Sequence, residues 1–267
     1  MTVPTVTGVP VETHLRARRD AGRKLLVPYL TGGVSADWTD YLRVYAEAGA
    51  DAVEIGLPFS EPTVDGPTVQ EASERALHRG TTLRGLLADL RAVRLDVPLI
   101  VMTYYHLVAR EGAAACCAAL AEAGVRGLIV PDLPLEESAE LEQAAAAAGV
   151  DLVLVAAPSA APARLRAIAH RSHGFVYAVT AMATTGERAE LPAGAGEFAA
   201  RLKEHTDLPV LLGFGISTPE HAVAGARTAD GVVVGSALMR RILDGATPAQ
   251  AGEFVAELRA ALDHAAP

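Results

Sequence analysis

Asp51-Ala-Val-Glu-Ile-Gly-Leu-Pro-Phe59 is a short apolar run of the sequence with a single glutamate, Glu54, near its centre. A run of β-branched and aliphatic residues that stops at glycine and proline is typical of a buried β-strand. An isolated carboxylate is expensive to bury, so a glutamate in such a strand needs a partner or a function. A second carboxylate, Asp65, follows in Ser60-Glu-Pro-Thr-Val-Asp-Gly-Pro67. One carboxylate on a strand and one on the next loop can act as an acid–base pair.

Outward from this run, strand-like and helical patterns alternate along the chain as a loose internal repeat. The expected strands are Leu25–Thr31, Ala52–Gly56, Leu99–Tyr104, Gly127–Val130, Leu152–Ala156, Phe175–Thr180, Val210–Gly213 and Gly231–Gly235. The helical patterns between them are Asp37–Ala48, Leu83–Arg94, Gly112–Ala123, Glu136–Ala148, Pro162–Arg171 and Pro219–Ala226. Such alternation indicates parallel strands covered by helices. Eight repeats in 267 residues favour a closed (β/α)8 TIM barrel over a doubly wound open sheet.

Two intervals between strands are longer than the repeat requires. After the second strand there is room for an extra helix near Thr68–His78. After the sixth strand, the segment Ala181–Gly196 is rich in Ala, Thr and Gly, which predicts a long mobile loop. Long loops in compact domains often close over a ligand or bind it. A leading helix, Val11–Arg23, is expected to cover the bottom of the barrel.

The composition is that of a globular chain that forms a core. Hydrophobic residues make up 51% of the sequence and no linker divides it, so we expect one domain over residues 1–267, with flexible tails at about 1–10 and 265–267. The net charge of −9 gives no electrostatic basis for binding nucleic acid or an anionic membrane. The N-terminus lacks a signal-peptide pattern, and no apolar run approaches the ~20 residues of a membrane span. These features predict a cytoplasmic protein.

Metal chemistry has no support in the sequence. Cys116 and Cys117 are adjacent in an alanine-rich helical stretch and lack the spacing of metal ligands, and the eight histidines form no cluster. We therefore expect no metal, and we interpret both cysteines as small residues of a helix.

Both carboxylates are expected on the catalytic face of the barrel, because active sites of this fold lie at the C-terminal ends of the strands. Glu54 is near the end of the second expected strand, and Asp65 is in the loop after it. Two other interpretations stay open at this point. Glu54 can be a structural glutamate satisfied by an arginine or by backbone groups. Asp65 can be a turn or cap residue, because Asp-Gly-Pro is favourable turn chemistry.

A candidate phosphate anchor follows the last two strands. The seventh runs into Gly213-Phe-Gly-Ile-Ser217, and the eighth ends at Gly235-Ser236. Glycines let backbone N–H groups approach a phosphate, and a short helix from Ser236 would point its N-terminus at it. Phosphates commonly bind at this place in the fold, so we expect a small phosphate ester as substrate. The expected phosphate-binding residues here are Gly213, Gly215, Gly235 and Ser236.

The long loop contains a further candidate segment, Thr184-Thr-Gly-Glu-Arg188. When the loop closes, Thr185 can hydrogen bond to a catalytic carboxylate and Gly186 can offer its amide to the phosphate. The alternative is a polar loop without a catalytic role. Tyr177, in the sixth strand, either faces the pocket or packs in the core. The expected substrate-binding residues are Tyr177, Thr185, Tyr29 and Tyr104.

Together these motifs resemble the tryptophan synthase alpha chain family. Its members carry Glu-Leu-Gly-Ile-Pro-Phe-Ser-Asp-Pro-x-Ala-Asp-Gly-Pro-x-Ile-Gln where this chain has Glu54-Ile-Gly-Leu-Pro-Phe-Ser-Glu-Pro-Thr-Val-Asp-Gly-Pro-Thr-Val-Gln70. Val130-Pro-Asp-Leu-Pro134, Gly213-Phe-Gly-Ile-Ser217 and Gly235-Ser236 match equally well. The likeness runs from about Leu25 to Leu243, which is nearly the whole chain.

The resemblance implies an enzyme that cleaves indole-3-glycerol phosphate to indole and glyceraldehyde 3-phosphate by a retro-aldol step, without a cofactor. Glu54 matches the acid/base that protonates the indole ring at C3 and then takes the proton of the glycerol hydroxyl as the C–C bond breaks. Asp65 matches the carboxylate that binds the indole N–H and stabilises the positive charge that develops on the ring nitrogen. Tyr177 and Thr185 match pocket and lid positions, and Gly186, Gly215, Gly235 and Ser236 match phosphate-anchor positions.

The departures from the family pattern gather on loops that, in the family, meet the β chain. This chain has Ser60-Glu-Pro62 where the family has Ser-Asp-Pro, and Tyr105-His-Leu107 where it often has Tyr-Asn-Pro. It has Gly32-Gly-Val-Ser35 where the family often has Ala-Gly-Asp-Pro. In the long loop, Ala183 replaces a glycine and should stiffen it. We therefore expect the chemistry to be retained, and we doubt the partnership with a β chain.

Three functions stay open at this point. The first is an α chain that passes indole to a β chain, and the second is a stand-alone indole-3-glycerol phosphate lyase that releases free indole. The third is a non-catalytic module that only activates a β chain, and the intact pair of Glu54 and Asp65 argues against it. We expect the first.

Overall fold

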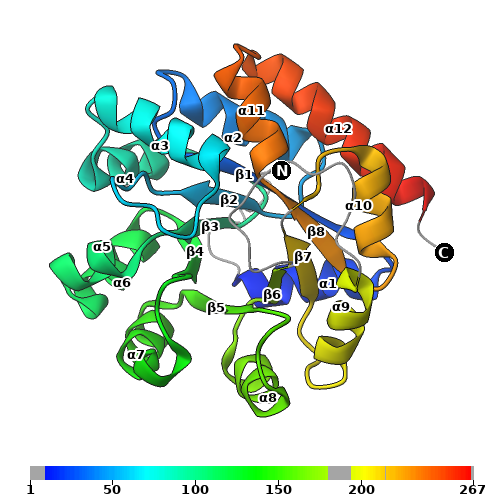
Figure 1. Ribbon diagram of the computed structural model, residues 1–267. Helices are drawn as coiled ribbons and strands as arrows, with labels where there is room; N and C mark the ends of the chain where they lie inside the picture. The colour runs from blue at the N-terminus through cyan, green and yellow to red at the C-terminus, as the bar shows by residue number, and fades with distance from the viewer. Residues whose placement is uncertain (1–9, 180–193, 214, 266–267) are drawn as a thin grey trace, which may run out of the picture.

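Eight parallel strands close into a barrel surrounded by helices in the computed structural model of the chain, which describes residues 10–179, 194–213 and 215–265 (Figure 1). The strands pair in chain order, and β8 pairs back to β1. Their bounds are β1 Leu25–Thr31, β2 Val53–Gly56, β3 Leu99–Met102, β4 Val125–Ile129, β5 Asp151–Ala156, β6 Val176–Val179, β7 Val210–Gly213 and β8 Gly231–Val234. The expected (β/α)8 barrel is confirmed, and closure of the sheet excludes the doubly wound alternative.

Helices follow the strands and form the outer ring in Figure 1. Their bounds are α1 Val11–Asp20, α2 Trp38–Glu47, α3 Pro67–His78, α4 Leu83–Ala92, α5 Tyr105–Glu111, α6 Ala113–Glu122, α7 Ala139–Ala148, α8 Pro162–Arg171, α9 Ala195–Lys203, α10 Pro219–Ala226, α11 Ser236–Leu243 and α12 Pro248–His264, with a 3-10 turn at Leu135–Glu137. The extra helix expected after β2 is α3. Cys116 and Cys117 are buried in α6, as expected.

Three helices, α5, α9 and α12, were not expected from the sequence. For α12 a local signal exists, because Thr247 and Gln250 form a capping box and Pro248 follows the cap. The start of α5 depends instead on Asp132, far along the chain, whose Oδ1 accepts a hydrogen bond from the Tyr105 amide at 2.9 Å. A contact of that kind cannot be predicted from local pattern.

The observed ends of the elements differ from the expected ones by a few residues. β3 ends at Met102, because Tyr104 is the N-cap of α5. Ala195 and Gly196, expected in the long loop, begin α9. Residues 180–193, which hold the rest of that loop, lie outside the described residues, as do residues 1–9 and 266–267 of the expected tails. That the whole chain is one domain stays a prediction.

Helix α1 covers the bottom of the barrel, as expected. Val11 and Leu15 are fully buried and pack against residues of the barrel interior. The Glu12 amide donates to Asp151 Oδ2 at 2.9 Å, so the first residue of β5 satisfies a free N–H at the start of α1. Burial of one apolar face and this long-range cap together hold the helix against the N-terminal ends of the strands.

A buried carboxylate, Asp51, joins β1, β2 and α12 at the same end of the barrel. Its side chain is fully buried and accepts hydrogen bonds from the Leu26 amide at 2.9 Å, Arg23 Nε at 2.7 Å and Arg259 Nη1 at 3.3 Å. A buried charge is tolerated when opposite charges and donors surround it in this way. Asp51 is therefore a structural carboxylate, and it provides a comparison for Glu54.

Candidate active site

Glu54 lies inside the barrel, near the C-terminal end of β2. Side chains alternate between the two faces of a strand, and Ala52, at the same parity as Glu54, packs in the barrel interior. In the register of the sheet, Glu54 lies beside Tyr29 of β1. The glutamate is 1% exposed, and burial, with the charge of Asp65 adding to it, raises its pKa to about 8.

Asp65 lies in the loop between β2 and α3 and is 4% exposed. Burial raises its pKa, and a hydrogen bond from Tyr104 lowers it, so that the pKa lies at about 6. Two neighbouring carboxyl groups with separated pKa values are suited to different roles. Between pH 6 and 8, Glu54 carries a proton that it can donate, while Asp65 is ionised and can stabilise a positive charge.

Glu54 is not held as a structural carboxylate is held. Among the described residues, Glu54 Oε2 has no hydrogen-bond partner, and neither does Asp65 Oδ1. Asp51, three residues before Glu54, has a backbone amide and two arginines around it. Buried polar atoms are nearly always satisfied in native proteins, so two unsatisfied carboxylate oxygens point to a ligand. The interpretation of Glu54 as a structural glutamate satisfied by an arginine is therefore not supported.

Tyr104 holds the side chain of Asp65. The Tyr104 hydroxyl donates to Asp65 Oδ2 at 2.9 Å and accepts a hydrogen bond from the Val64 amide at 3.2 Å. The backbone of Asp65 is held as well, because Gln70 Nε2 donates to its carbonyl oxygen at 2.8 Å. The N-cap of α3 is Gly66, and no side chain caps this helix. The Asp65 carboxylate is thus not a helix cap.

Two tyrosines lie over glycines of neighbouring strands. Tyr29 of β1 reaches across Gly56 of β2, and a Cβ at Gly56 would overlap its hydroxyl. Tyr177 of β6 reaches across Gly213 of β7 in the same way. Burial raises the pKa of both hydroxyls, with Asp65 adding to the effect at Tyr29 and Glu54 adding to it at Tyr177. Both tyrosines therefore lie inside the barrel near the carboxylates. Tyr177 also packs against Phe175 in the barrel interior, with ring centroids 6.1 Å apart, so its role in a pocket stays a prediction.

The expected phosphate anchor is only partly described. Gly215 has φ of +82°, a conformation that favours glycine. Gly235 is the N-cap of α11, and no side chain caps this helix, so the N–H groups of its first turn, from Ser236 on, are not taken by a cap. The structure explains the glycine at position 213 in another way, because the absence of a side chain there makes room for the ring of Tyr177. Thr185 and Gly186 lie outside the described residues.

The helix after Asp65 and the helix at the phosphate anchor are joined to each other. Arg240 Nη2 of α11 bonds to Glu71 Oε2 of α3 at 3.0 Å, and Arg75 Nη2 of α3 donates to the Leu243 carbonyl oxygen of α11 at 3.1 Å. Both helices also contact β1. The loop that carries Asp65 and the N-terminus of α11 are therefore held in a fixed relation by one packed unit.

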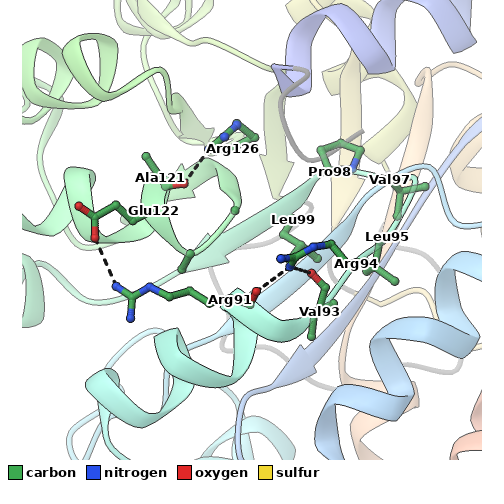
Figure 2. Close-up of a pocket in the computed structure, with 12 residues that line it drawn as sticks. Arg91, Val93, Arg94, Leu95, Val97, Pro98, Leu99, Ala121, Glu122 and Arg126 are labelled. Carbon is green, nitrogen blue, oxygen red and sulfur yellow. Dashed lines mark hydrogen bonds and ion pairs between the residues drawn. The ribbon is translucent and has the colours of Figure 1, made fainter. Parts of the chain in front are cut away.

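An arginine-lined pocket of 220 Å³ lies between α4 and α6, around the N-terminal ends of β3 and β4 (Figure 2). Arg94 Nη1 donates to the carbonyl oxygens of Arg91 and Val93, and Arg126 Nη1 donates to those of Ala121 and Val125. These bonds are made near the C-terminal ends of α4 and α6, where cations favourably meet the helix dipole. Leu99, which lines the pocket, is adjacent to Ile100 of the barrel interior and so faces outward, whereas Glu54, the register partner of Ile100, faces inward.

A metal-binding cluster and a membrane-spanning helix are both absent from the part of the chain that the structure describes. No group of three or more His, Cys, Asp or Glu side chains there is arranged to hold a metal ion. Among the helices that the structure describes, none is long and apolar enough to span a membrane.

One residue that holds the site was not predicted from the sequence. Phe59 lies on the loop after β2, and its ring stacks on Tyr104 with centroids 5.0 Å apart and an interplanar angle of 24°. The local signal was weak, since a lone aromatic residue in a loop of prolines and polar residues suggests only partial burial. The stacking partner comes from the next β–α unit, which the sequence does not place beside it.

The chain matches the family model described as tryptophan synthase alpha chain over residues 15–265. The tryptophan synthase alpha chain of Picosynechococcus sp. is 41% identical over 260 residues, which cover 96% of this chain and 98% of that relative. The one from Chloroflexus aurantiacus is 44% identical over 236 residues, which cover 86% and 88%. Among solved structures, Mycobacterium tuberculosis tryptophan synthase matches with a TM-score of 0.87 at 35% identity, covering 94% of this chain and 97% of that one. Tryptophan synthase subunit alpha from Legionella pneumophila str. Paris matches with a TM-score of 0.85 at 29% identity, covering 95% and 98%.

Proposed function

The chain belongs to the tryptophan synthase alpha chain family, and we propose that its Glu54 and Asp65 carry out the retro-aldol cleavage of indole-3-glycerol phosphate to indole and glyceraldehyde 3-phosphate. The chain is therefore a carbon–carbon lyase. The observation that carries the assignment of roles is the buried carboxyl pair, in which burial raises the pKa of Glu54 to about 8 and that of Asp65 to about 6.

The first step of the proposed mechanism is transfer of the Glu54 proton to C3 of the indole ring. Indole is a poor leaving group as a carbanion, and protonation at C3 converts it into an iminium ion that can leave as neutral indole. Glu54 suits this step because burial keeps its proton in place up to a pH of about 8. A general acid works best when its pKa lies near the operating pH.

Asp65 has the second role, at the ring nitrogen. Positive charge develops there once C3 is protonated, and a buried, ionised carboxylate stabilises it strongly. The free oxygen Oδ1 is available for the indole N–H, since Oδ2 is already bonded to Tyr104. A carboxylate that is held in advance needs no reorganisation when the charge appears.

The C–C bond breaks in the last step. Glu54, now a carboxylate, takes the proton from the hydroxyl on the glycerol carbon that is attached to C3. The electrons of that O–H bond form the carbonyl of glyceraldehyde 3-phosphate, and the electrons of the broken C–C bond return to the ring. Glu54 ends the cycle protonated, so no cofactor is needed to balance the reaction.

The phosphate of the substrate is placed at the start of α11 in this proposal. Gly215, Gly235 and Ser236 lie at the C-terminal ends of β7 and β8, and the uncapped first turn of α11 presents N–H groups and the positive end of the helix dipole. Gly186 completes the proposed anchor and Thr185 the proposed lid contact.

We also propose that the chain works with a tryptophan synthase β chain. The departures in the loops that follow β1, β2 and β3 made us doubt this partnership, but the comparisons give that doubt no support, because the relatives and solved structures are α chains or tryptophan synthases. No specific observation favours the stand-alone lyase or the non-catalytic activator. Action in the cytoplasm stays a prediction.

The test is the release of indole from indole-3-glycerol phosphate by the purified chain, with and without a cognate β chain. We expect cleavage that increases when the β chain is added. High turnover that the β chain leaves unchanged would favour the stand-alone lyase. Glu54→Gln should abolish cleavage under both conditions while the substrate still binds, and near-normal turnover of this variant would refute the assigned role.

A further inference from the structure

Phe59 has no role in the mechanism above, yet it lies against the residue that holds Asp65. Its ring stacks on Tyr104 at 5.0 Å on one side and lies 5.9 Å from the ring of His106 at 38°. Phe59 is half-buried, Tyr104 is 4% exposed and His106 is exposed. Phe59 therefore contacts both a surface side chain, His106, and the tyrosine that bonds to a catalytic carboxylate.

The direction of the Tyr104 hydroxyl proton is set by its neighbours. A tyrosine hydroxyl has one proton to donate and lone pairs to accept with. Because the Val64 amide donates to this oxygen at 3.2 Å, the proton is left for Asp65 Oδ2, at 2.9 Å. The Tyr104–Asp65 bond, at 2.9 Å, is charge-assisted when Asp65 is ionised, and hydrogen bonds depend strongly on geometry.

The backbone of Tyr104 is held from outside the aromatic cluster. Tyr104 is the N-cap of α5, and the amide of the next residue, Tyr105, is bonded to Asp132. The Tyr104 side chain is buried, and its orientation depends on the groups packed against its ring. The stacked ring of Phe59 covers one face of Tyr104 and so restricts its rotation.

We propose that Phe59 is a positioning residue of the cleavage reaction, which acts by holding the Tyr104 hydroxyl on Asp65. The inference rests on the proposed function, since it needs Asp65 to be ionised in the reacting enzyme. The phenyl ring of Phe59 has no group that could bond to Glu54 or Asp65. Its contribution appears only through Tyr104.

The expected consequence is a change in the protonation of Asp65. The hydrogen bond from Tyr104 stabilises the ionised carboxylate and lowers its pKa, against burial, which raises it. Losing or weakening the bond therefore raises the pKa of Asp65, and the acid limb of the pH–rate profile moves to higher pH. The titratable groups whose charges act at this site are Glu54, Asp65, Tyr29, Tyr104 and Tyr177.

The experiment is a double-mutant cycle of Phe59→Ala and Tyr104→Phe, with cleavage measured across pH. A hydrogen bond to a carboxylate shifts its pKa by about one unit or more, so we expect Phe59→Ala to move the acid limb up by about one unit and to lower kcat about fivefold at pH 6, where Asp65 of the wild type is about half ionised. Phe59→Tyr, which keeps the stacked ring, should restore both. In the Tyr104→Phe background, Phe59→Ala should have no further effect on the acid limb.

Three outcomes would overturn the proposal. The first is an acid limb of Phe59→Ala at the same pH as in the wild type. The second is a double variant whose acid limb is shifted by the sum of the two single shifts. The third is a Phe59→Tyr variant whose acid limb and kcat do not return to wild-type values. If Phe59→Ala does not fold, Phe59→Leu takes its place, because it keeps apolar volume without a stacking ring. Titration of the Asp65 carboxyl by NMR in ¹³C-labelled protein compares the pKa of Asp65 between the wild type and the variants without a need for turnover. An inactive wild type with the expected NMR shifts would therefore refute the proposed function and leave the positioning role supported.

Discussion

Glu54→Gln should stabilise the protein at alkaline pH while it removes activity. The pKa of Glu54 is raised from its usual 4.5 to about 8 in the folded protein, because the side chain is buried and Asp65 lies near. The folded state therefore holds the proton more tightly than the unfolded chain. Between these two pH values the unfolded chain has lost the proton and the folded protein has kept it, so the free energy of unfolding falls as pH rises.

The size of the effect follows from the shift. Each pKa unit corresponds to about 1.4 kcal/mol, so the ionisable Glu54 costs the folded protein at most about 5 kcal/mol above pH 8. Glutamine has nearly the same shape and cannot ionise. The advantage of the variant over the wild type should grow by about 1.4 kcal/mol for each pH unit from 5 to 8 and then stay level. A constant offset from the new amide does not change this slope.

The assay is urea denaturation of wild type and variant at pH 5, 6, 7, 8 and 9, with the free energy of unfolding extrapolated to water. Glu61→Gln is the matched control, because it removes an exposed glutamate from the loop next to Glu54. We expect its curve to run parallel to that of the wild type. If the curve of Glu54→Gln is also parallel to that of the wild type, Glu54 is not a protonated buried acid and the reasoning on its role fails.

Three further predictions concern the same site. The kcat/KM of the wild type for cleavage should rise as pH increases through about 6, where Asp65 ionises, and fall as pH increases through about 8, where Glu54 loses its proton. A kcat/KM that stays constant from pH 5 to 9 would contradict the roles assigned to the two carboxyl groups. Asp65→Asn should lower kcat by about 10²–10³-fold in steady-state assays, since it removes the charge that stabilises the ring nitrogen, and retained turnover would mean that this role is wrong. Gly213→Ala should destabilise the fold by about 1–3 kcal/mol in thermal melts, because its Cβ would overlap the ring of Tyr177. Gly235→Ala is the matched comparison: its Cβ would meet Tyr29 at an ordinary 3.7 Å, so it should fold as the wild type does and instead raise KM.

The alternation of strands and helices was enough to predict the barrel, because each strand of a parallel sheet must be followed by a crossover helix that covers it. The strand ends at Leu25, Thr31, Val210 and Gly213 are where the sequence placed them. Helices that begin with a local signal, such as the proline at the start of α8 and of α10, were also correctly placed. Helix α5 was missed because the amide of its first residue, Tyr105, is satisfied by Asp132, which lies after the next strand, β4.

The residue pattern is enough to predict that a carboxylate, Glu54, lies in an apolar strand and that a second one, Asp65, follows it on a loop. Which carboxylates have partners depends on contacts between distant parts of the chain. Asp51 is surrounded by arginines from before β1 and from α12, whereas Glu54 meets no such group among the described residues. Likewise Tyr104 reaches Asp65 because the loops after β2 and β3 meet at one end of a closed barrel. These contacts join residues far apart along the chain, and they exist only once the register of the strands is set. The local sequence pattern therefore identifies the groups that can react, and the burial and contacts that follow from barrel closure determine their protonation.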